Sequence, residues 1–165
     1  MGASHSSIRI LVVGLTGSGK THLLDLLSGE CAAGRPTNGY HEVTYDYEGY
    51  RFIFTEYGGA VDWEKLIKLD TGPPFGCVYM VMGKKSLDTS RDFSPANNAL
   101  LMLSTFFPTN VPFAVIWNRS PASPTFQYPR NRRVCSVTLD FEATAECLEK
   151  IYRLLRWTSA QSNIA

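Results

Sequence analysis

The chain lacks any long hydrophobic run, because its most apolar segments, such as residues 77–82 and 113–117, are only as long as a strand. A membrane-spanning helix needs about 20 consecutive apolar residues, so the sequence predicts no such helix. The chain also has little excess charge, since 16 basic and 15 acidic residues leave a net charge of +1. This balance argues against nucleic acid as a partner and against an anionic membrane held by surface charge alone.

Paired cysteine motifs are missing as well. Cys31, Cys77, Cys135 and Cys147 form no CxxC pair and have no metal-ligand spacing. Two of them fall in apolar runs, which favours reduced, buried thiols over disulfides. The first residues are small and polar and do not resemble a secretory signal. These absences predict a cytoplasmic protein.

The composition suits one folded domain, since the chain has 165 residues, of which 44% are apolar. We expect a domain over residues 8–158, with flexible tails at residues 1–7 and 159–165. Strand-like runs alternate with helical patterns, which is typical of a mostly parallel sheet covered by helices on both faces. The predicted strands are residues 8–13, 77–82, 113–117 and 133–139. One helix is predicted directly after residue 20, and three more are predicted at residues 61–69, 96–106 and 142–157.

A tight hairpin is predicted at one edge of this sheet. Residues 42–47 and 50–55 are strand-like and are separated only by Glu48 and Gly49, a length and composition typical of two-residue β-turns. Further along, residues 120–132 contain Pro121, Pro124 and Pro129 and are expected to form an extended loop instead of a helix.

Residues 14–21, with the sequence GLTGSGKT, match the phosphate-binding pattern G-x-x-x-x-G-K-[ST] between a predicted strand and a predicted helix. Glycines allow a tight turn whose N–H groups face phosphate oxygens, the lysine neutralises the β and γ phosphates, and the threonine hydroxyl binds Mg²⁺. A glycine-rich turn with an accidental lysine is the alternative, and the context disfavours it. The motif does not distinguish GTP from ATP. The predicted contacts are Gly14, Thr16, Gly17, Ser18, Gly19, Lys20 and Thr21.

Two further segments, together with the phosphate loop, resemble the Arf and Arf-like small GTPases of the Ras superfamily. Residues 36–40, PTNGY, are similar to the switch I motif, and residues 56–60, EYGGA, lie where the switch II motif belongs. The hairpin between them resembles the family's interswitch. The resemblance implies a three-layer P-loop G domain with one antiparallel hairpin edge.

The resemblance also implies a nucleotide switch that binds GTP or GDP with Mg²⁺ and recruits effectors through the switch and interswitch surface. In that case Thr37 contacts Mg²⁺ and the γ-phosphate, and the Gly59 N–H group meets the γ-phosphate. Thr21 and, through water, Glu56 complete the metal site. The hairpin is expected to slide in register between the two nucleotide states.

Two departures from the family pattern lie in switch II. Glu56 replaces an aspartate and is one methylene longer, which is expected to disturb the Mg²⁺ water shell. Ala60 replaces the glutamine that orients the attacking water, and alanine has no group to do so. Very slow or absent GTP hydrolysis is therefore expected.

A third departure lies in the base-binding motif, which has Asn118, Arg119 and Pro121 in place of Asn, Lys and Asp. Asn118 and the Arg119 stem still suit a base, but the carboxylate that selects guanine is missing, so the identity of the base stays open. Cys135 and Ser136 resemble the last base-contact loop.

The N-terminal sequence MGASHS matches the myristoylation pattern with Gly2 as the acceptor. One acyl chain without a basic patch gives only weak, reversible membrane association. An unmodified tail is the alternative.

Two hypotheses follow for the whole chain. The first is an Arf-like GTP-binding switch in membrane or intracellular trafficking with impaired hydrolysis. The second is a pseudo-GTPase that serves as an interaction scaffold, with altered or absent guanine specificity. A small P-loop kinase is disfavoured, because the motifs at residues 36–40 and 56–60 have no role there.

Overall fold

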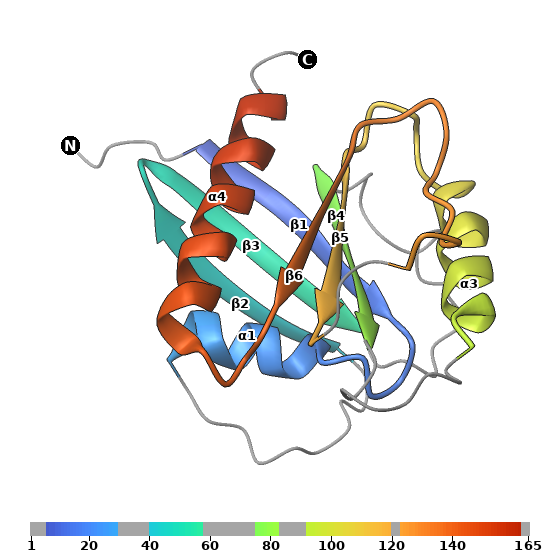
Figure 1. The fold of residues 1–165 in the computed structure, drawn as a ribbon. Helices are drawn as coiled ribbons and strands as arrows, with labels where there is room; N and C mark the ends of the chain where they lie inside the picture. The colour runs from blue at the N-terminus through green and yellow to red at the C-terminus, as the bar shows by residue number, and fades with distance from the viewer. Residues whose placement is uncertain (1–5, 30–39, 58–74, 83–91, 120–122, 163–165) are drawn as a thin grey trace.

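The computed structural model describes residues 6–29, 40–57, 75–82, 92–119 and 123–162. They contain a six-stranded sheet with the order β2-β3-β1-β4-β5-β6 (Figure 1). β2 and β3 pair antiparallel, whereas every other neighbouring pair is parallel. This mostly parallel sheet with an antiparallel hairpin at one edge confirms the predicted fold class.

Strands and helices largely follow the predicted order. Their bounds are β1 (Ser6–Gly14), α1 (Lys20–Ser28), β2 (Tyr40–Tyr47), β3 (Tyr50–Tyr57), β4 (Gly76–Met82), α3 (Ser94–Ser104), β5 (Phe113–Asn118), β6 (Val134–Leu139) and α4 (Thr144–Ser162). The helix predicted at residues 61–69 lies outside the described residues. No helix in the described part of the chain is long and apolar enough to cross a membrane.

Both ends of the folded domain extend further than predicted. β1 begins at Ser6 instead of residue 8, and α4 continues to Ser162, so residues 159–162 are helical and not part of a tail. The last turns of α4 are held in place because Thr158 is buried and Arg133 donates a hydrogen bond to the Gln161 side chain at 2.8 Å.

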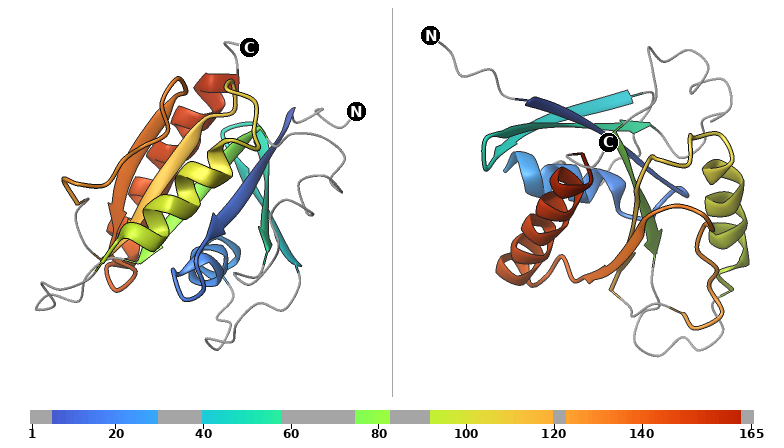
Figure 2. Two further views of the ribbon diagram at one scale, coloured as in Figure 1. Left: turned by 90° about the vertical axis from the view of Figure 1, so that its right-hand side faces the viewer. Right: turned by 90° about the horizontal axis from the view of Figure 1, so that it is seen from above.

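Each face of the sheet has its own hydrophobic cluster. In β1 the side chains alternate, so Ile10 and Val12 face α1 and α4, whereas Leu11 and Val13 face α3. Figure 2 shows the resulting layers, with α3 on the opposite side of the sheet from α1 and α4. The molecule is thus a helix–sheet–helix sandwich in which β1 is buried on both faces.

The hairpin turns at Glu48 and Gly49, whose φ angles of 49° and 82° are typical of a two-residue primed turn. Its tip is attached to α4. Tyr47 stacks on Tyr152 with 4.9 Å between ring centroids, and Arg156 donates two hydrogen bonds to Glu48 Oε1, at 3.0 and 2.8 Å. The edge of the sheet is therefore connected to the end of the chain.

The connection from β5 to β6 contains no helix in its described residues, 123–133, as the prolines predicted. It covers the sheet with aromatic side chains instead. Phe126 packs edge-on against Trp117 with 4.8 Å between ring centroids, and Trp117 donates a hydrogen bond to the Tyr128 hydroxyl at 3.3 Å. An extended loop therefore covers this part of the sheet, on the same face as α3.

Arg132 attaches this loop to the end of α3. Its guanidinium lies over the Phe113 ring, 4.6 Å from the centroid, and donates hydrogen bonds to the turn after the helix. The acceptors are the carbonyl oxygens of Ser104, Phe107, Pro108 and Val111, at 2.7, 3.1, 3.3 and 3.2 Å. One side chain thereby satisfies the last carbonyl of the helix, that of Ser104, and three carbonyls of the segment that follows it.

We predict that Arg132→Ala lowers the free energy of unfolding by about 3 kcal/mol, because four carbonyls, three of them in part-buried hydrogen bonds, lose a charged donor. Urea unfolding measures the loss. Arg130→Ala is the matched control, since Arg130 lies in the same loop and is exposed, and it should change stability by less than about 0.5 kcal/mol. Equal effects of the two substitutions would show that these hydrogen bonds do not stabilise the loop.

Candidate functional site

The phosphate-binding motif lies at the edge of the sheet where the parallel strands end (Figure 1). β1 ends at Gly14 and α1 begins at Lys20, so residues 15–19 form the turn between them. The ends of β3, β4, β5 and β6 lie at the same edge. Open α/β sheets bind their ligands at this edge, and the structure brings most of the predicted site residues there.

Gly14 allows the turn to pass close to β4. Its φ angle is +148°, and a Cβ atom there would lie 2.5 Å from the carbonyl oxygen of Met80 and 2.8 Å from Ser18 Oγ. The Ser18 N–H group then donates to the Leu15 carbonyl at 3.1 Å, which tightens the turn. A side chain at position 14 would push β1 and β4 apart just where the motif begins.

The amino-terminal end of α1 suits an anion. Gly19 precedes the helix with a φ angle of 100°, no side chain caps the helix, and its first turn has no acidic residue. Ser18 is buried, and its hydroxyl oxygen has no hydrogen-bond partner among the described residues. Uncapped N–H groups and the helix dipole favour negative charge here, so the loop fits a phosphate group.

Lys20 places a buried positive charge at the centre of this site. Its side chain is only 5% exposed, and Nζ donates hydrogen bonds to the carbonyl oxygens of Gly14 at 2.8 Å and Leu15 at 2.9 Å. Burial lowers the pKa of Lys20, and the negative charge of Glu56 partly opposes that shift. A bound anion would further stabilise the ammonium form.

Thr21 and Glu56, two of the predicted metal ligands, contact each other directly. The Thr21 hydroxyl donates to Glu56 Oε1 at 2.8 Å, and Glu56 is buried at the end of β3. His41 lies opposite it on β2, with Nδ1 3.8 Å from Glu56 Oε2. Hydroxyl and carboxylate oxygens are ligands that suit Mg²⁺, so these two residues fit the metal that the resemblance implies.

Asn118 and Arg119 lie beside the phosphate loop at the end of β5. Asn118 is buried, and its Nδ2 is 3.4 Å from the Ser18 carbonyl oxygen, close to the backbone of Gly19. Arg119 has a φ angle of +74°, and its N–H group donates to the Leu139 carbonyl at 2.8 Å. The chain therefore turns sharply after Asn118 and joins the end of β6.

Phe141 is a site residue that sequence reasoning missed. It stacks on His22 of α1 with 4.6 Å between ring centroids and an interplanar angle of 12°. Its ring also lies close to Gly19, since a Cβ atom there would be 3.6 Å from Phe141 Cε2. A lone aromatic residue directly after a predicted strand was the available signal.

Cys135 and Ser136, in contrast, are not brought to this edge. They pair with Ala114 and Val115 in the first half of β6, whereas Asn118 pairs with Leu139 at its end. At about 3.3 Å per residue, Ser136 lies roughly 10 Å from the edge along the strand. The structure therefore does not bring Cys135 and Ser136 together with the other predicted site residues, and residues 140–142 are the ones that follow the end of β6. Gly2, Thr37, Gly59, Ala60 and Pro121 lie outside the described residues.

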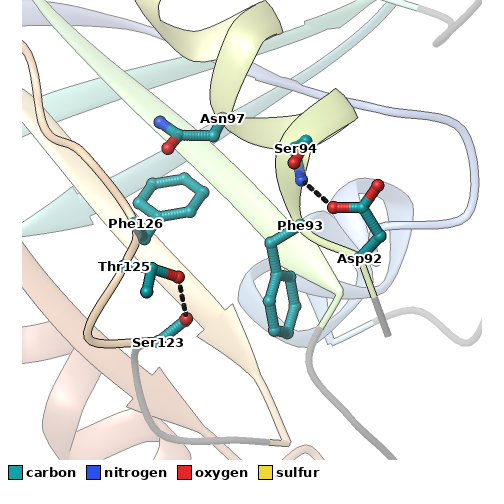
Figure 3. A pocket seen from close by; sticks show the side chains of 7 residues that line it. All are labelled: Asp92, Phe93, Ser94, Asn97, Ser123, Thr125 and Phe126. Atoms are coloured by element: carbon teal, nitrogen blue, oxygen red, sulfur yellow. Dashed lines mark hydrogen bonds between the residues drawn. The ribbon is translucent and has the colours of Figure 1, made fainter. Parts of the chain in front are cut away.

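A separate cavity of about 250 Å³ lies on the α3 face of the sheet (Figure 3). Asp92 accepts the Ser94 N–H group at 2.8 Å, and the hydroxyls of Ser123 and Thr125 are 3.1 Å apart. No residue of the phosphate loop lines it. The remaining lining residues are Phe93, Asn97 and Phe126.

We predict that Gly14→Ala lowers the free energy of unfolding by about 3 kcal/mol, because the new Cβ atom meets the backbone of Met80. Gly17→Ala is the control. Its φ angle is also positive, at +78°, but no atom lies within 4 Å of its added Cβ, so only backbone strain of about 1 kcal/mol is expected. Urea unfolding compares the two, and similar losses would contradict the role assigned to Gly14.

Comparison with known proteins adds two findings. The family model of the ADP-ribosylation factor family matches residues 1–95, more than half of the 165 residues. Among solved structures, the chain is similar to the Arl6 BBS3 small GTPase from Trypanosoma brucei with bound nucleotide analogue GppNp, with a TM-score of 0.69 and 17% identity over 94% of this chain and 99% of that chain. At that identity the likeness concerns the fold.

The family match spans all three motifs that carried the resemblance, namely residues 14–21, 36–40 and 56–60. The solved structure shares the mixed sheet described above. The chain therefore belongs to the ADP-ribosylation factor family of small GTP-binding proteins.

Proposed function

We propose that the chain is a nucleotide-dependent switch that binds GTP and GDP together with Mg²⁺. The observation that carries the proposal is the buried ammonium of Lys20, which lies beside the uncapped amino-terminal end of α1. A buried positive charge next to N–H groups that no side chain caps is suited to a phosphate chain. The switch function itself is inferred from the family.

Each residue of the site has a distinct role in this proposal. Lys20 and the N–H groups of residues 15–19 hold the phosphates, and Ser18 offers a further hydroxyl donor. Thr21 and Glu56, with Thr37, would hold Mg²⁺. When bound, the metal ion neutralises charge on the phosphates and helps to order the switch segments.

Impaired hydrolysis is part of the proposal. Ala60 has no side-chain group that could orient a water molecule. The direct contact between Thr21 and Glu56 adds to this, since the longer carboxylate reaches the hydroxyl that is expected to bind the metal. We infer a switch that stays in its triphosphate state for long periods unless a partner assists it.

A scaffold that does not depend on nucleotide is the second candidate. It is favoured by one observation, namely that Lys20 already has two carbonyl partners in the loop, so the loop does not need a ligand to satisfy it.

In either case we propose effector proteins as partners at the switch and interswitch surface. We also propose a cytoplasmic location, with a role in membrane or intracellular trafficking and weak membrane association if Gly2 is myristoylated.

We predict that the purified chain binds GTP in the presence of Mg²⁺ and that Lys20→Ala abolishes binding, because the phosphates lose their charged donor. Titration calorimetry measures both. Lys20→Met is the matched variant, since it keeps the apolar stem but removes the charge, and it should also weaken binding by at least roughly tenfold. If the wild-type chain binds no nucleoside triphosphate, the switch is excluded and the scaffold stands.

We further predict that Ala60→Gln raises the single-turnover rate of GTP hydrolysis, provided that Glu56 still holds the metal-bound water. The comparison is made with wild-type protein loaded with the same radiolabelled GTP. An unchanged rate with unchanged GTP affinity would show that Ala60 is not the cause of slow hydrolysis and would direct attention to Glu56.

A further inference from the structure

Base selection is the function for which this chain lacks the usual side chain, because Pro121 stands where the family's aspartate is expected. We propose that Glu142 supplies the missing carboxylate and makes the site selective for a guanine base. This inference rests on the proposed nucleotide-binding function and names the residue that gives it specificity.

Glu142 lies at the edge of the sheet where the parallel strands end, which is where this role requires it. It follows β6 and precedes α4, so it sits at the end of the strand that neighbours β5. The Arg119 N–H group joins the two strand ends through its hydrogen bond to Leu139 at 2.8 Å. Glu142 Oε1 lies 3.7 Å from Nη2 of the same Arg119. The carboxylate is thus a direct neighbour of the residue expected to stack on the base.

The other carboxylate in this connection is already used by the fold. Asp140 Oδ1 accepts the backbone N–H group of Glu142 at 3.0 Å, in the turn that leads into α4. This hydrogen bond fixes the backbone of Glu142 but does not involve its side chain. Of these two acidic residues, Glu142 is therefore the one that can turn toward a ligand.

The ion pair between Glu142 and Arg119 does not hold the carboxylate firmly. The side chains are 80% and 41% exposed, and exposed ion pairs at this distance are weak. Both groups can therefore exchange their mutual contact for contacts with a base. Arg119 would keep its stem against the base plane while Glu142 accepts hydrogen bonds at the base edge.

A second acceptor lies at the same rim. Asn118 is buried, and its Oδ1 atom has no hydrogen-bond partner among the described residues. A buried acceptor without a donor is costly and indicates a ligand that brings N–H groups. Guanine carries an N–H group and an amino group side by side, which one carboxylate can accept together, whereas adenine has an unprotonated nitrogen at the corresponding ring position.

Nucleotide titrations of the full-length chain test this inference. GTP, xanthosine triphosphate and ATP are titrated with Mg²⁺ into the wild type, Glu142→Gln and Glu142→Ala. We expect Glu142→Gln to weaken GTP binding by roughly tenfold and to strengthen binding of xanthosine triphosphate, because the carboxamide donates to the oxygen at the base position where guanine has its amino group. ATP binding should stay the same in all variants.

Glu146→Gln is the matched control. Glu146 lies in the first turn of α4, is 62% exposed and forms an ion pair with Lys150, so it shares the favourable position near the helix dipole but not the contact with Arg119. It should leave all three affinities unchanged. Thermal unfolding of each variant reports any general effect of the lost charge.

The outcomes separate this inference from the function on which it rests. Loss of GTP preference in Glu142→Gln but not in Glu146→Gln supports Glu142 as the selecting residue. If all variants keep the wild-type preference, or if the wild type binds the three triphosphates equally, the inference is overturned while triphosphate binding stands. If no triphosphate binds to any of them, both the inference and the proposed function fail.

Discussion

The structure of the site depends on the burial of one ammonium group. Lys20 is 5% exposed, and a charge so far from water needs partners that are fixed in place. The carbonyls of Gly14 and Leu15 provide them, because the loop between β1 and α1 bends back over the lysine. That bend requires glycine at position 14, where β1 and β4 meet. The pairing of the central strands and the geometry of the phosphate loop therefore constrain each other.

The hairpin connects this site to the far end of the chain. Glu56 accepts a hydrogen bond from the Thr21 hydroxyl and lies on β3. The other end of the same hairpin contacts α4 through Tyr47 and Glu48. A hairpin that slides in register, as the family resemblance leads us to expect, has to break these contacts with α4. The ion pair is exposed and the stacked rings are only partly buried, so these contacts bias such a movement without forbidding it.

Much of the fold was predictable from local patterns. The alternation of strands and helices, the two-residue turn at Glu48 and Gly49, and the phosphate loop all follow from periodicity and turn chemistry within short segments. Position along a strand is different, because Cys135 and Ser136 belong to a correctly predicted strand but lie in its first half, away from the end that neighbours Asn118. The position of these residues relative to the strand end is set by the register between β6 and β5, which the sequence does not reveal.

Contacts between distant segments were also beyond prediction. Nothing local to Arg132 indicates that it binds carbonyls at and after the end of α3, and nothing local to Phe141 indicates that it stacks on His22. The same holds for Glu142, because its proposed role depends on its proximity to Arg119. These residues matter through three-dimensional neighbours that one sequence does not reveal.

The central claim is that this divergent member of the family has kept a working triphosphate site. The most direct test is to purify the chain without added nucleotide, denature it, and identify any released nucleotide by chromatography and mass spectrometry. We expect a guanine nucleotide in near-stoichiometric amount, mainly GTP if hydrolysis is impaired. An extract with no nucleotide, from protein that also fails to take up GTP with Mg²⁺, would contradict it.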